Sequence, residues 1–111
     1  MKMYTLVIHA PDYTVIEEGK KSFDAVLKDG VGVGYAISKN DVNRLPPGSK
    51  VVLLRKDKNQ RRAEGQLVKL VPTNKYTPQG IQRYDVHIAG LKPVPYKPER
   101  LNHYGIAVLD C

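Results

Sequence analysis

The chain has 111 residues, which suits a single domain (residues 1–111) that is large enough to bury a core without disulfide or metal support. Its 41% hydrophobic content, with seven tyrosines, argues against disorder, and eight prolines with nine glycines predict many turns and short strands. The formal net charge of +7 favours an anionic partner, although a cationic surface is more often only a solvated face.

The first predicted element is a strand at residues 4–9, where apolar side chains occur on both faces. It ends at the turn 10–12 and is too short for a signal-peptide core or a membrane span, so we expect a cytoplasmic protein that does not contact membranes. Residues 13–21 are ambiguous. A short helix is predicted next, with Ser22 as its N-cap and Gly30 in the left-handed conformation that ends it.

Residues 31–38 alternate bulky and very small side chains, which predicts a strand with one nearly bare face. The alternation places Tyr35 and Gly32 on opposite faces. We favour another backbone crossing the bare face at a tight barrel corner, with close approach of a ligand as the alternative. Residues 40–45 suit one helical turn.

Residues 51–71 are the most informative stretch, because two apolar runs flank a cationic turn and so predict a β-hairpin. Between residues 44 and 69 there are eight Lys or Arg and two acids, so this segment carries +6 of the net charge of +7. Two interpretations are open: a clamp for phosphate groups, or a solvated, charge-protected hairpin end. The cations that we expect to contact nucleic acid are Lys50, Arg55, Lys56, Lys58, Arg61 and Arg62.

The C-terminal third predicts two more strands, at residues 83–89 and 106–109. Residues 91–96 contain two prolines, which lack a backbone N–H donor, so we expect an extended connector there and not a central strand. Residues 98–101 suit a helical turn with proline at its first position.

These elements predict an α+β fold that is mainly β: a small, strongly bent β-barrel of five or six strands with two short helices. A flat sandwich is the alternative.

Few residues suit metal or catalytic chemistry. Cys111 is the only cysteine, so a monomer has no disulfide and no Cys-based zinc site, which fits a reducing compartment. The histidines lack metal-ligand spacing, and we expect no metal and no cofactor. His9 and Asp12 could act as a base and its orienting group, which is the enzyme alternative.

Four stretches of the sequence carry a family resemblance. They are the first strand with Ala10-Pro11-Asp12-Tyr13, Phe23-Asp24-Ala25-Val26, Pro47-Gly48-Ser49-Lys50-Val51-Val52-Leu53-Leu54, and Ala63-Glu64-Gly65-Gln66-Leu67-Val68 with Val71-Pro72. Their order and spacing, over most of the chain, resemble the PUA-like superfamily and within it the EVE domains. The chain has phenylalanine at position 23, where the family usually has tryptophan, and serine at position 49, where it usually has aspartate.

The resemblance implies a PUA-like barrel that binds nucleic acid without catalysis and accepts a flipped, often modified base in a pocket. The expected base pocket comprises Tyr13, Phe23, Asp24 and Tyr35, with the base stacked on Phe23.

Two functions are therefore open. The first is a non-catalytic module that binds DNA or RNA through the basic hairpin and the base pocket. The second is a protein-interaction or regulatory β-barrel that binds an acidic protein partner, with residues 93–98 as part of the contact.

Overall fold

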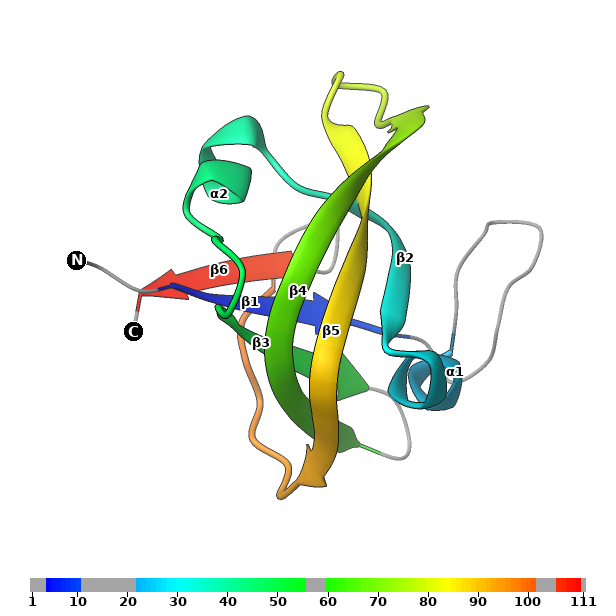
Figure 1. Ribbon diagram of the computed structural model, residues 1–111, viewed down its shortest axis with the longest axis vertical. Helices are drawn as coiled ribbons and strands as arrows, with labels where there is room; N and C mark the ends of the chain where they lie inside the picture. Colours follow the sequence, from blue (N-terminus) through cyan, green and yellow to red (C-terminus); the bar gives the residue numbers. More distant parts are fainter. Residues whose placement is uncertain (1–3, 11–21, 56–59, 102–105, 111) are drawn as a thin grey trace.

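The computed structural model describes residues 4–10, 22–55, 60–101 and 106–110, which form six strands and two short helices (Figure 1). The strands are β1 (Tyr4–His9), β2 (Val31–Ala36), β3 (Lys50–Arg55), β4 (Arg61–Tyr76), β5 (Gln82–Val94) and β6 (Ile106–Asp110). The helices are α1 (Phe23–Asp29) and α2 (Lys39–Asn43).

The six described strands form one sheet, in the order β2-β5-β4-β3-β1-β6. β1 and β3 are parallel, and the other neighbouring strands are antiparallel. The sheet curls, so that the long β4–β5 ribbon crosses the shorter β1, β3 and β6 in Figure 1. The prediction of a mainly β, barrel-like α+β fold with two short helices is confirmed.

Two clusters of buried side chains lie on opposite faces of this sheet. The larger one fills the inside of the curl and includes Leu6, Phe23, Leu53 and Val86. The smaller one comprises Val7, Val52 and Leu54, on which the partly buried Tyr96 and Leu101 pack. The central strands β1 and β3 are therefore covered on both faces, which explains the apolar character of both faces in the sequence.

Local signals define α1 as predicted. The Ser22 side chain accepts a hydrogen bond from the N–H of Ala25 at 3.2 Å. Gly30 has φ of 72° and donates its N–H to the carbonyl oxygen of Val26, so it ends the helix in the left-handed conformation.

The alternation predicted for residues 31–38 is wrong from Gly32 onward. Gly32 pairs with Val86 and Tyr35 with Tyr84, so one extra residue in β2 forms a bulge and brings Gly32 and Tyr35 to the same inner face. A Cβ atom on Gly32 would lie 2.7 Å from the Tyr35 ring. The atoms nearest to that Cβ position belong to the side chains of Tyr35 and Ile8, and not to another backbone segment.

The prolines of the C-terminal third also behave differently from the prediction. β5 continues to Val94, and Pro93 pairs with Ala63 of β4. Because β5 pairs with β2 only as far as His87, this part of β5 has one neighbouring strand, an edge position that tolerates proline. Residues 95–101 form no helical turn, and Tyr96 and Leu101 pack on the smaller core cluster.

Candidate functional site

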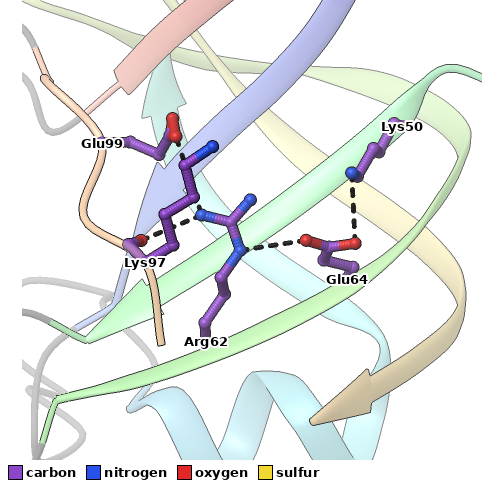
Figure 2. Close-up of polar contacts among 5 residues, drawn as sticks. All are labelled: Lys50, Arg62, Glu64, Lys97 and Glu99. Atoms are coloured by element: carbon purple, nitrogen blue, oxygen red, sulfur yellow. Dashed lines mark hydrogen bonds and ion pairs between the residues drawn. The ribbon is translucent and has the colours of Figure 1, made fainter. Parts of the chain in front are cut away.

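Arg62 fastens β4 to the segment 95–101 through a network of polar contacts (Figure 2). Its Nε is 2.9 Å from a carboxylate oxygen of Glu64, and its Nη1 donates to the carbonyl oxygen of Lys97 at 2.9 Å. Nη1 also lies 3.8 Å from Glu99. The side chain is only 8% exposed, so Arg62 is not the projecting phosphate contact that the sequence suggested.

The two arginines that flank the hairpin end also have partners inside the protein. Arg55 is 5% exposed and belongs to the buried residues. Arg61 stacks its guanidinium over the Phe23 ring, 4.6 Å from the centroid, and forms an ion pair with Asp24 of α1. Lys56 and Lys58, the predicted tip cations, lie outside the described residues. Of the predicted hairpin arginines, Arg61 alone has a partly exposed side chain.

Three of the four residues expected to form a base pocket lie in the described part of the chain, and these three do not form an open site. Phe23 is 1% exposed, in the core beneath Arg61, and offers no free face for a base. Tyr35 is 9% exposed and donates its hydroxyl to the carbonyl oxygen of His9 at 2.9 Å. Burial raises the pKa of Tyr35 far above its ordinary value. Asp24 is exposed beside Arg61, and Tyr13 lies outside the described residues.

A shallow groove of about 590 Å³ lies on the outer face of the sheet, where β3, β4 and β5 meet. Lys50 and Lys92 are its exposed cations. The full lining comprises Gly48, Lys50, Glu64, Gly65, Gln66, Ala89, Gly90 and Lys92. Glycine and alanine make up half of these residues, so the groove floor is largely backbone and methyl groups.

A β-bulge builds this floor. Glu64 pairs with Lys92 and Gln66 with Ala89, so two residues of β5 lie opposite the single residue Gly65. Gly90, within the bulge, has φ of 66°, which favours glycine. A Cβ atom on Gly65 would lie 2.7 Å from the carbonyl oxygen of Ala89, so the two strands approach at a distance that only glycine allows.

The carboxylate in the groove is already neutralised by two cations. Glu64 is 3.1 Å from Nζ of Lys50 and 2.9 Å from Nε of Arg62 (Figure 2). Burial by itself would raise the pKa of Glu64, but the hydrogen bonds and charges of Arg62 and Lys50 outweigh it and hold the pKa below its ordinary value. Glu64 is therefore ionised near neutral pH and its charge is shared with two partners.

Two further lysines extend the cationic surface along the same outer face. Lys92 lies opposite Glu64, and Lys69 lies opposite His87. Both lysines are exposed, and neither has an ion-pair partner among the described residues. We call Lys50, Lys69 and Lys92 the outer lysines.

The described residues also bear on the predictions about catalysis, metal binding and membranes. His9 is described but Asp12 is not, so the predicted pair lies partly outside the described residues. The described residues contain no group of three or more His, Cys, Asp or Glu arranged to hold a metal ion. Both described helices are too short to cross a membrane.

Comparisons of the chain with family models, with curated proteins and with solved structures found no significant match. The PUA-like resemblance therefore rests on the sequence motifs alone.

Sequence reasoning missed Lys69 and Lys92 as site residues, because neither belongs to the cationic hairpin end. Two signals were available. Gly65 and Gly90 are glycines within strands, which indicate a bulge or a close approach, and Lys92 follows Gly90 by two residues. The convergence of Gly65, Gly90 and Lys92 on one groove depends on the β4–β5 register, which the sequence alone does not define.

Proposed function

We propose that the protein binds nucleic acid without catalysis, and that the phosphate backbone lies along the outer face of β3, β4 and β5. The observation that carries this proposal is the groove between Lys50 and Lys92, in a chain whose positive charge is concentrated between residues 44 and 69. Clustered exposed cations attract a polyanion, and the release of its counterions supplies affinity.

The shape of the groove supports phosphate binding. Its floor of glycine and alanine lets a chain of phosphates come close to the sheet, and the lysines can bind from either side. Glu64 would repel a phosphate, but Lys50 and Arg62 offset its charge. Arg62 thus contributes indirectly, by pairing with Glu64, and not through direct contact.

The hairpin end extends the proposed surface. Arg61 has 36% of its side chain exposed, and Lys56 and Lys58 follow β3 in the sequence. The resemblance to PUA-like domains favours the same class of ligand. Phosphate contacts carry no sequence information, so we expect both DNA and RNA to bind at low salt.

Paired charge substitutions test the proposed surface. Lys69→Gln with Lys92→Gln removes two outer lysines, and Lys28→Gln with Lys39→Gln removes two exposed lysines of α1 and α2 with the same change in net charge. We expect the first pair to reduce the slope of log affinity against log salt by roughly 1.4 to 1.8, since each phosphate contact contributes ~0.7 to 0.9. The second pair should change the slope by much less. Equal effects of the two pairs would contradict a localised surface.

The acidic-partner alternative gains no support from residues 93–98. Tyr96 packs on the smaller core cluster, and the carbonyl group of Lys97 accepts a hydrogen bond from Arg62. Two residues of this segment therefore make contacts within the protein, while the side chains of Pro93, Pro95 and Pro98 are exposed. A protein partner would be the better account if the Lys69/Lys92 variant lost an acidic co-purifying protein while its affinity for nucleic acid stayed unchanged.

A further inference from the structure

The β4–β5 hairpin projects beyond the rest of the sheet as a two-stranded arm. β3 accompanies β4 only as far as Gln66, and β2 pairs with β5 from Arg83 onward. Residues 73–81, which we call the arm, thus have no neighbouring strand outside their own hairpin among the described residues. They form the tip at the top of Figure 1.

The arm is internally ordered although it projects. Thr77 is 4% exposed; its backbone N–H donates to the carbonyl oxygen of Ile81 at 2.8 Å, and its hydroxyl accepts from the N–H of Ile81 at 3.1 Å. The hydroxyl of Thr73 donates to the carbonyl oxygen of Arg83 at 2.8 Å. Gln82 donates its side-chain amide to the carbonyl oxygen of Thr73 at 2.9 Å. The arm therefore presents its exposed side chains on a preorganised frame.

Tyr76 is the most conspicuous of these exposed side chains. It is 59% exposed, whereas the other large exposed hydrophobic side chain among the described residues, Val68, is 46% exposed. Neither a core nor a neighbouring strand accounts for an aromatic ring at the end of a projecting hairpin. Lys75, which precedes it in β4, is also exposed, so an aromatic ring and a cation are both accessible near the end of the arm.

The charge of the surrounding ribbon indicates what this surface binds. From Gly65 to Tyr84 the sequence contains Lys69, Lys75 and Arg83 but no Asp or Glu. An exposed aromatic ring near a lysine, in the stretch 65–84 that has no carboxylate, matches the way in which proteins bind single-stranded nucleic acid: bases stack on the ring and phosphates contact the cations.

We infer that Tyr76 is a stacking platform for an unpaired base, and that the protein binds single-stranded nucleic acid in preference to duplex. This inference rests on the proposed function. It adds that the nucleic acid is single-stranded and that one of its bases contacts Tyr76. A base inside a duplex keeps both faces stacked on its neighbours, so only an unpaired base can offer a face to Tyr76 without paying the cost of unstacking.

The test compares Tyr76→Ala, Tyr76→Phe and the matched control Val68→Ala, using fluorescence anisotropy with a labelled single-stranded oligonucleotide of twelve nucleotides and the duplex of the same sequence. We expect Tyr76→Ala to weaken single-strand binding by roughly 5- to 150-fold, since one stacked base contributes about 1–3 kcal/mol. Tyr76→Phe keeps the ring and should bind like the wild type, and Val68→Ala should also bind like the wild type. Duplex binding should be unchanged by all three substitutions.

The outcomes separate this inference from the proposed function. A wild-type protein that binds neither oligonucleotide at low salt contradicts both. A wild-type protein that binds with the predicted salt dependence, but whose affinity for the single strand is the same after Tyr76→Ala, contradicts the stacking role alone. An equal loss of single-strand and duplex affinity also contradicts it. An upfield shift of the Tyr76 ring resonances on addition of the single strand would support stacking independently of affinity.

Discussion

Glu64 has both a structural role and a place in the proposed binding surface. It lines the proposed phosphate groove, yet it also neutralises the nearly buried guanidinium of Arg62. Removing its charge would leave a buried cation with fewer partners, which is costly in a low-dielectric environment. The need to pair with Arg62 thus explains why a carboxylate lies in a cationic groove. Arg62 in turn holds the segment 95–101 against β4.

We expect Glu64→Gln to lower the free energy of unfolding by about 1–3 kcal/mol at pH 7, the usual range for a lost charge-assisted hydrogen bond. The pKa of Glu64 is lowered in the folded state, so its contribution to stability is fully present above the ordinary pKa of 4.5 and is lost as the pH falls through the lower folded-state value. The difference between the variant and the wild type should therefore shrink in acid. Denaturant titrations between pH 3 and 7 measure it.

Asp24→Asn is the matched control for this prediction. Asp24 also pairs with an arginine, but 66% of its side chain is exposed, and exposed ion pairs contribute less than about 1 kcal/mol. A loss from Glu64→Gln no larger than that from Asp24→Asn, or one that is constant with pH, would contradict the role given to Glu64.

Among the secondary-structure elements, the β4–β5 ribbon contains most of the residues that the two proposals involve. Its bulge at Gly65 makes the groove, its outer face holds Lys69 and Lys92, and its free end forms the arm. The bulge depends on the absence of a side chain at position 65, because the carbonyl group of Ala89 occupies the space that a Cβ atom would need.

Gly65→Ala tests this dependence. A Cβ atom there would also lie 2.9 Å from a methyl carbon of Ile88, so the strands must separate or shift. We expect a loss of about 1–3 kcal/mol in stability, which corresponds to a fall in Tm of several degrees, together with weaker binding of nucleic acid. Gln66→Ala, at the exposed neighbouring position, is the control and should leave Tm nearly unchanged. A Gly65→Ala protein with the wild-type Tm would contradict the close approach of the two strands.

Local signals were sufficient for much of this fold. The caps of α1 at Ser22 and Gly30, the β3–β4 hairpin and the strand at 106–109 were predicted because short-range patterns determine them. Bulges were not predicted, since they appear only when a strand meets its partner. The burial of Arg62 was missed for a similar reason: its partners Lys97 and Glu99 lie more than thirty residues away in the sequence. The lysines of the groove likewise converge only in the folded sheet.

At the scale of the whole molecule, burial divides the cations that were predicted or proposed to bind nucleic acid into two groups. Arg55 and Arg62 are enclosed by the protein, whereas the outer lysines and Arg61 are at least partly exposed. The outer lysines and Arg61 lie on β3, β4 and β5, whereas the exposed Lys28 and Lys39 belong to the two helices. The charge asymmetry of the sequence thus persists in the fold as a surface property, although two of the predicted arginines do not contribute to it directly.

The most direct test of this account is the salt dependence of nucleic-acid binding by the wild-type protein. The outer lysines, Arg61, Lys56 and Lys58 make six candidate phosphate contacts. If most of them engage, log affinity should fall linearly with log salt with a slope of roughly −3 to −5. Failure to bind any DNA or RNA at low salt, or a slope between zero and about −1, would contradict the claim that this surface binds the phosphate backbone.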